Sequence, residues 1–229
     1  MTKWLASVQS VDEAKSLINV LPDILDMKDP SRGALGELDV SVVSEIVSLI
    51  NGKCLTSATV GDLEMDVTVL GPAIEDMASS GVDYVKIGLF PDENIRQCLS
   101  DIASVIKPLE TPVIAVLFAD RPLGLEVQTL LAESGFRGVM VDTAIKNGKH
   151  LLDHMTLDKL STFVNAAKQQ NLLSGLAGAL RQEDISVLSS LDADYLGFRS
   201  ALCEQRERNG GLDLQRIKAV KASLDGYQK

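Results

Sequence analysis

Two lysines occupy positions where a charged amine is costly. Lys28 ends the apolar segment DILDMK (23–28), and Lys86 interrupts the apolar segment DYVKIGLF (83–90). A buried ammonium loses hydration that only a counter-charge or loss of the proton can offset. Such lysines concentrate at functional sites, and a neutral amine can attack an aldehyde to form a Schiff base. Lys28 and Lys86 are therefore candidate catalytic residues; the alternative is that Lys86 forms a structural ion pair or extends to the rim.

Carboxylates accompany both candidate amines. Asp26 lies two residues before Lys28, so the period-2 alternation of a strand places both side chains on one face, where the carboxylate can orient the amine or carry a proton. Two lysines facing each other across a barrel would leave one of them neutral. Asp142 and Lys146 form a second candidate catalytic pair, although Lys146, next to Asn-Gly, also fits a solvated loop charge.

Eight short apolar segments, typical of parallel strands covered on both faces, alternate with amphipathic stretches. The predicted strands are 3–8, 23–28, 53–60, 83–90, 113–120, 138–143, 172–178 and 194–199. The predicted helices are 11–20, 40–50, 69–79, 92–106, 121–134, 156–169, 181–190 and 212–225, with Ser10, Asp39, Asp120 and Thr156 as N-caps or first-turn acids. This order predicts a single α/β domain over 1–229, a (β/α)8 TIM barrel, with a doubly wound open sheet as the alternative.

A TIM barrel places its active site at the carboxyl ends of the strands, which selects the candidate binding residues. Phosphate is frequently bound after strands seven and eight, where small residues admit backbone N–H groups and an arginine adds a charge-assisted donor. Glycines that only pack the barrel are the alternative explanation of the first of these loops. The candidate substrate- and phosphate-binding residues are Ser57, Thr59, Asp120, Gly178, Ala179, Arg199 and Ser200.

The amino-acid composition of the chain limits the kinds of partner that it can bind. The formal charge of -10 and the pI near 4.7 disfavour nucleic acid and anionic membranes, so a phosphorylated substrate needs a locally positive site. The N-terminus lacks the apolar core of a signal peptide and the longest apolar run, 113–119, is far too short for a membrane span, which predicts a cytoplasmic protein. The sequence leaves a homo-oligomer open.

Metal and disulfide chemistry find little support in the sequence. The three cysteines are widely spaced without a CxxC pair. His150 and His154 have the i,i+4 spacing that could present two imidazoles to one metal, but no HExxH motif surrounds them. We therefore expect no metal and no cofactor, with acid–base work falling to Lys, Asp, Glu or Tyr.

Six motifs together resemble the family of (5-formylfuran-3-yl)methyl phosphate synthases over almost the full length. They are DMKDPSRGALG (26–36), SATVGD (57–62), YVKIGL (84–89), VDTAIKNGK (141–149), LAG (176–178) and RNGGLD (208–213). One departure is Arg199-Ser200, where the family often has Arg-Gly. The resemblance implies a cofactor-free carbon–oxygen lyase acting on phosphates, in the biosynthesis of methanofuran, a coenzyme of one-carbon metabolism.

In that family two glyceraldehyde 3-phosphate molecules condense to a furan aldehyde phosphate with loss of phosphate and water. The resemblance implies that Lys28 forms the Schiff base and Lys86 accepts a proton. It also carries over Asp26, Asp142 and Lys146 as site residues. The alternatives are another Schiff-base sugar-phosphate aldolase of class I type and a barrel used as a non-catalytic subunit.

Overall fold

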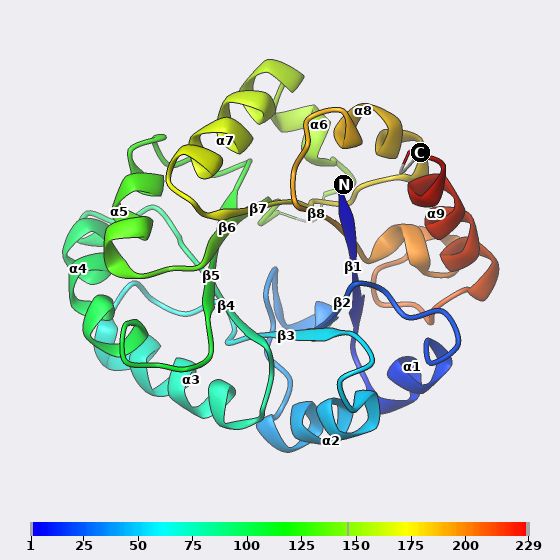
Figure 1. Cartoon of the computed structure of the whole chain (residues 1–229), viewed down its shortest axis with the longest axis horizontal. Helices are drawn as coiled ribbons and strands as arrows, with labels where there is room; N and C mark the ends of the chain where they lie inside the picture. The colour runs from blue at the N-terminus through cyan, green and yellow to red at the C-terminus, as the bar shows by residue number, and fades with distance from the viewer. Residues whose placement is uncertain (1, 146, 228–229) are drawn as a thin grey trace.

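The computed structural model describes residues 2–145 and 147–227. Within this part of the chain, eight parallel strands close into one barrel in chain order, with β1 paired to both β2 and β8 (Figure 1). The strands are β1 Lys3–Val8, β2 Ile24–Met27, β3 Leu55–Thr59, β4 Tyr84–Gly88, β5 Val113–Phe118, β6 Gly138–Asp142, β7 Leu173–Leu176 and β8 Tyr195–Phe198. The predicted barrel is confirmed, and the open-sheet alternative is wrong.

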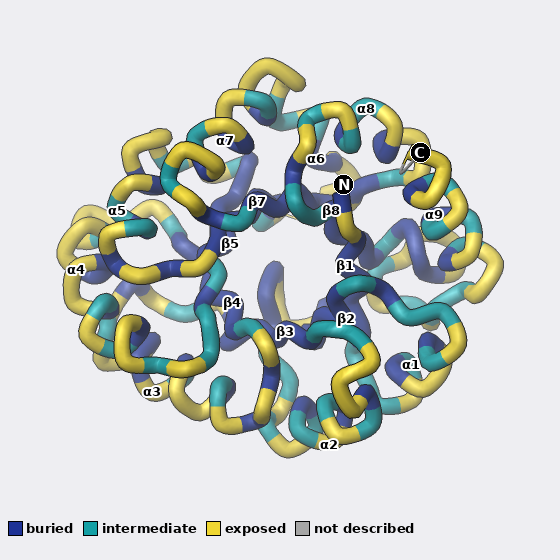
Figure 2. Tube along the Cα trace, in the orientation of Figure 1, coloured by how far each residue is buried: buried dark blue, intermediate teal, exposed yellow. Residues whose placement is uncertain are grey.

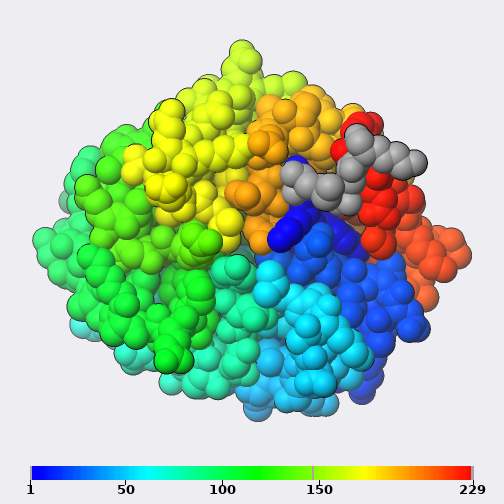
Figure 3. Space-filling model, in the orientation of Figure 1, coloured from blue at the N-terminus to red at the C-terminus, as the bar shows by residue number. Residues whose placement is uncertain are grey.

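Helices surround the barrel and bury one face each against it. The α-helices are α1 Val11–Ser16, α2 Val40–Ile50, α3 Val67–Ser79, α4 Ile95–Ile106, α5 Val127–Ser134, α6 Leu151–His154, α7 Leu157–Gln169, α8 Ile185–Ser189 and α9 Leu214–Gly226. Strands and the inner sides of helices are buried while the outer sides are exposed (Figure 2). The chain colour runs round the space-filling view in order from blue to red, as consecutive βα units produce (Figure 3).

Local capping chemistry explains where several helices begin. The Ser10 side chain accepts from the Glu13 amide ahead of α1, and the Thr156 side chain accepts from the Lys159 amide ahead of α7. Asp39 precedes α2 without a capping hydrogen bond from its side chain. The prediction for Asp120 is wrong, because α5 begins only at Val127 and its N-cap residue is Glu126. The short helix α6 was not predicted.

Strand register aligns the polar residues of the barrel interior. Ser7 pairs with Asp26 across β1 and β2, and Asp26 pairs with Ser57 across β2 and β3. Residues paired in register on parallel strands point to the same face, so these three side chains meet inside the barrel. All three are buried.

Candidate active site

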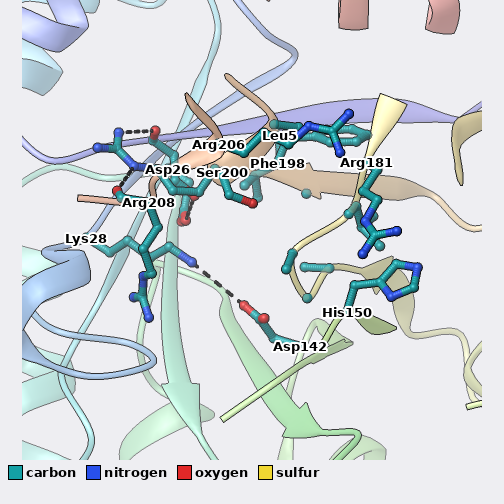
Figure 4. A pocket seen from close by; sticks show the side chains of 18 of the residues that line it. Leu5, Asp26, Lys28, Asp142, His150, Arg181, Phe198, Ser200, Arg206 and Arg208 are labelled. Carbon is teal, nitrogen blue, oxygen red and sulfur yellow. Dashed lines mark hydrogen bonds and ion pairs between the residues drawn. The ribbon is translucent and has the colours of Figure 1, made fainter. Parts of the chain in front are cut away.

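A cavity of about 390 Å³ lies at the carboxyl ends of the strands and the loops that follow them (Figure 4). Its lining includes four of the five residues predicted to be catalytic: Asp26, Lys28, Lys86 and Asp142. The fifth, Lys146, lies outside the described residues. Four chemically active side chains, from β2 and the residue that follows it and from β4 and β6, therefore converge on one volume, which is of the size that small-molecule sites occupy.

Asp26 and Lys86 form a buried ion pair at the floor of the cavity. The Lys86 Nζ lies 2.7 Å from Asp26 Oδ1, and the two residues are 3% and 0% exposed. The hydroxyls of Ser57 and Ser7 donate to the same carboxylate at 2.6 and 3.0 Å. Burial alone would raise the pKa of Asp26, but the charges of Lys86 and Lys28 and the hydrogen bonds from Lys86 and Ser57 outweigh it and hold the pKa below its ordinary value. Asp26 is therefore an oriented carboxylate in contact with an amine.

Lys28 and Asp142 face each other across the cavity. The Lys28 Nζ lies 3.7 Å from Asp142 Oδ2, a contact marked in Figure 4, and both residues are buried. The Thr143 amide donates to the other carboxylate oxygen at 2.7 Å, which fixes the orientation of Asp142. A carboxylate so close to an amine can exchange protons with it.

The loop that carries Lys28 is held by residues of the β3 end. The Thr59 hydroxyl donates to the Gly36 carbonyl at 3.0 Å, and the Asp62 carboxylate accepts from the amides of Ala34 and Leu35. Gly33 has φ +121, and a Cβ there would collide with the Asp62 carboxylate, so the turn requires glycine. These contacts fix the backbone that follows Lys28.

The structure therefore corrects two predicted substrate contacts. Thr59 is fully buried, does not line the cavity and supports the Lys28 loop. Ser57 likewise does not line this cavity, and its hydroxyl is bound to Asp26. Both act on the site through other residues.

Asp120 is a third correction. Its carboxylate accepts from the amides of Ala144 and Ile145 at 2.8 and 2.6 Å, and it is absent from the cavity lining. Although burial opposes the shift, these hydrogen bonds lower the pKa of Asp120. Asp120 thus fixes the backbone of the loop after β6, which sequence reasoning could not distinguish from a substrate contact.

The loops after β7 and β8 present unused backbone donors to the cavity. Gly178, Ala179 and Ser200 all line it, as predicted from their positions. Among the described residues no acceptor is found for the amides of 178–180 or of 200–201. Gly178 has φ +114, and a Cβ there would come within 3.0 Å of Thr143, so glycine is needed for the close approach of the two loops. Backbone amides that border one cavity and have no internal acceptor suit an anion.

Arg199 differs from its predicted role as a phosphate ligand. Its guanidinium lies 2.5 Å from a Glu13 oxygen, in a pair whose side chains are only 7% and 11% exposed, and also donates to the carbonyls of Ser7, Arg208 and Gly210. These contacts use all five N–H groups of an arginine. Although Arg199 borders the cavity, it joins α1, β1 and the loop after β8. It positions that loop.

Replacing Arg199 by methionine is expected to lower the free energy of unfolding by about 3–5 kcal/mol, because Glu13 would keep a buried charge without its partner. Urea denaturation measures the change. The double variant Arg199→Met, Glu13→Gln is the control and should recover part of the loss. A single variant that loses less than about 1 kcal/mol, the range of exposed pairs, would contradict this role.

His150 and Arg208 line the cavity but were missed as site residues by sequence reasoning. The His150 ring lies 2.6 Å from Asp153 through Nδ1, with Nε2 3.7 Å from Asp184. Arg208 reaches from the loop after β8 to donate to the Gly33 carbonyl at 2.8 Å, near Lys28 in Figure 4. The sequence signals for Arg208 were its place in the polar segment after the last strand and in the motif RNGGLD (208–213).

The thiol of Cys203 is buried and lies outside the cavity lining. Burial raises the pKa of Cys203 to about 11, so its thiol is protonated at neutral pH. No group of three or more His, Cys, Asp or Glu placed to hold a metal ion occurs in residues 2–145 and 147–227. No helix within the same residues has the length and apolarity to cross a membrane.

A closed eight-stranded barrel with a lysine-bearing cavity at the carboxyl ends of its strands is the arrangement of a TIM-barrel enzyme. The fold is similar to solved 3-hexulose-6-phosphate synthase (TM-score 0.63, 15% identity, 97% of this chain and 100% of that chain). It is also similar to 3-keto-L-gulonate-6-phosphate decarboxylase from Vibrio cholerae (TM-score 0.67, 10% identity, 99% and 98%). These identities support the fold alone.

The family is shown by sequence. Residues 4–221 match the family model described as 4-HFC-P synthase, and the chain belongs to this family. A relative in Methylorubrum extorquens is 38% identical over 225 residues, covering 98% of this chain and 92% of that protein. A (5-formylfuran-3-yl)methyl phosphate synthase of Methanothermobacter thermautotrophicus is 31% identical over 233 residues, covering 97% and 99%. One of the same name in Methanopyrus kandleri is 33% identical over 219 residues, covering 91% and 92%.

Proposed function

We propose that the chain is a lyase that condenses two molecules of glyceraldehyde 3-phosphate into (5-formylfuran-3-yl)methyl phosphate through a Schiff base on Lys28, for methanofuran biosynthesis. The observation that carries this proposal is a buried amine, Lys28, facing Asp142 in the same cavity as the Lys86–Asp26 pair. The family membership supports the product, because relatives bear its name.

The overall reaction balances without an external oxidant or reductant. Two triose phosphates contain the atoms of the furan phosphate, one inorganic phosphate and two waters. The enzyme therefore needs only carbonyl activation and proton transfers, which amines and carboxylates can supply. This is why we propose a cofactor-free mechanism.

Each residue has a defined task in this proposal. The Lys28 amine adds to a carbonyl and expels water as the imine forms, and the iminium then acidifies the neighbouring C–H. The Asp26–Lys86 pair, joined at 2.7 Å, accepts that proton through the Lys86 amine, whose own proton passes to Asp26. The resulting carbanion equivalent attacks the second carbonyl. Asp142, 3.7 Å from Lys28, exchanges protons during imine formation and hydrolysis. The resemblance to the family carries over Lys146 as a further site residue, which lies outside the described residues.

The phosphate of the imine-bound triose would bind the amides of 178–180 and 200–201. These donors border the same cavity as Lys28 and come from the loops after β7 and β8. Ala179 has φ +48, a left-handed conformation that turns successive amides toward one side. Backbone donors are already oriented before the anion arrives, so binding requires little reorganisation.

The direct test is incubation of the purified protein with glyceraldehyde 3-phosphate. We expect a strongly ultraviolet-absorbing product with the mass of the furan phosphate, released with one inorganic phosphate per furan. Addition of borohydride during turnover should attach one triose phosphate to Lys28, as located by peptide mass spectrometry.

Two other outcomes would contradict the proposal and favour a different function. Trapping at Lys28 with a sugar-phosphate product and no furan would indicate another class I aldolase. Neither trapping nor turnover would favour a non-catalytic barrel, whose lysines only balance buried carboxylates.

A further inference from the structure

A second group of cations lines the same cavity away from the catalytic lysines. Lys149 comes from the loop after β6, Arg181 from the loop after β7 and Arg206 from the loop after β8. We call these three residues the outer cation cluster. In Figure 4 Arg181 lies beside His150, on the side of the pocket opposite Lys28. None of the three has a part in the proposed imine chemistry.

The charges of the outer cation cluster are hardly neutralised. Within residues 2–145 and 147–227, neither Arg181 nor Lys149 has an ion-pair partner. Arg206 is held by one contact, from its Nη2 to a Glu183 oxygen at 3.5 Å, which leaves its other side-chain N–H groups without a partner in the described part of the chain. The inner cations differ, since Lys86 pairs with Asp26 and Arg199 with Glu13.

The backbone around the cluster is fixed in unusual conformations. Gln205 and Arg206 have φ of 52 and 60, two successive non-glycine residues in the left-handed region. Such conformations persist only where surrounding contacts impose them, and they gather at ligand-binding loops. The Arg181 amide donates to Asp184 at 2.8 Å, which fixes the start of its side chain. Both arginines are therefore presented to the cavity from ordered backbone.

The residues that line the cavity carry a net positive charge, although the net charge of the whole chain is negative. The lining contains seven lysines and arginines but only three carboxylates, in a chain of formal charge -10. Unpaired cations around a partly enclosed volume raise the local concentration of anions, and arginine binds phosphate through two parallel hydrogen bonds. The backbone amides of 178–180 and 200–201 provide one anion site, and the outer cation cluster provides charge for another.

We propose that Lys149, Arg181 and Arg206 form a second phosphate subsite, which binds the phosphate of the incoming triose while the first triose is attached to Lys28. This inference rests on the proposed function, because a reaction that joins two phosphorylated molecules needs two such subsites. The cluster acts by binding and orientation and takes no part in proton transfer.

The test uses the double variant Arg181→Gln, Arg206→Gln in the full chain. Borohydride trapping of the first triose at Lys28 should match the wild type. The glyceraldehyde 3-phosphate concentration that gives the half-maximal rate of furan formation should rise by about tenfold or more, since charged hydrogen bonds are lost. Equilibrium dialysis against inorganic phosphate should give two bound ions per wild-type chain and one per variant chain.

Arg96→Gln is the matched control, because Arg96 is also an exposed arginine beside one glutamate, Glu126, but lies outside the cavity. It should behave as the wild type in all three measurements. The double variant Arg181→Lys, Arg206→Lys keeps both positive charges and should recover part of the substrate affinity. Such recovery would show that the loss in the glutamine variant comes from the missing charges and not from misfolding.

Separate outcomes test the subsite and the proposed function. Unchanged half-saturation and two bound phosphates in the double variant would overturn the subsite. Equal loss of trapping and of furan formation in a folded double variant would also overturn it, by assigning the cluster to the first triose. Absence of trapping and furan in the wild type would overturn the proposed function, while the dialysis result would still decide the number of anion sites.

Discussion

Replacing Lys28 by methionine is expected to abolish furan formation and borohydride-dependent attachment of substrate together. Methionine fills a similar volume but has no amine to add to a carbonyl, and loss of a covalent nucleophile typically costs roughly 10⁴-fold or more in turnover. Lys28 is only 8% exposed, so few other amines could replace it at the same point of the cavity. Product absorbance and intact-protein mass spectrometry measure the two losses.

Two further variants separate chemistry from charge. Lys28→Arg keeps a cation near Asp142, but a guanidinium does not lose its proton at neutral pH and forms no imine, so it should be as inactive as Lys28→Met. Lys159→Met removes an exposed lysine of α7 and should have wild-type activity. Furan formation by Lys28→Arg at the wild-type rate would refute the covalent role.

Replacing Asp26 by asparagine is expected to impair both turnover and folding. The Lys86 ammonium, 2.7 Å from Asp26 and 3% exposed, would lose the negative charge that balances it. Breaking a buried pair in this way typically costs about 3–5 kcal/mol in the free energy of unfolding. Urea denaturation at pH 7 measures this loss, and product formation by the folded fraction measures the effect on proton transfer.

The same substitution should change the pH dependence of stability. Burial alone would raise the pKa of Asp26, but the opposite effect of Lys86, Lys28 and the Ser57 hydroxyl is larger. The folded-state pKa of Asp26 therefore lies below the unfolded value near 3.9. The Asp26 carboxylate therefore stabilises the fold above about pH 4, and this stabilisation is lost as the pH falls through the folded-state pKa. Wild-type stability should fall more steeply than that of Asp26→Asn in this acidic range.

Asp76→Asn provides the comparison, because Asp76 is an exposed carboxylate of α3 that belongs to none of the ion pairs found in residues 2–145 and 147–227. Its acid-induced loss of stability should follow the wild-type slope. Parallel slopes for wild type and Asp26→Asn would show that the buried carboxylate is not a source of the pH dependence.

The local part of the site could be predicted from the sequence because it depends on short-range geometry. The two-residue spacing of Asp26 and Lys28 on one strand brings both into the cavity, as strand alternation requires. Lys86 could be identified in the sequence because a charge within an apolar strand needs a partner, and in the structure that partner is Asp26. The eight alternating strand and helix patterns likewise predicted the barrel.

The sequence by itself determined the barrel and the residues at its strand ends, since hydrophobic periodicity and strand alternation are properties of neighbouring residues. Only the tertiary structure decided which of these polar residues face the cavity. Arg199 donates to Glu13, 186 positions away, and Thr59 donates to Gly36, 23 positions away, so each side chain has an internal hydrogen-bond partner. Buried polar groups bind whichever partners the closed fold brings near, and no local pattern encodes those distant contacts.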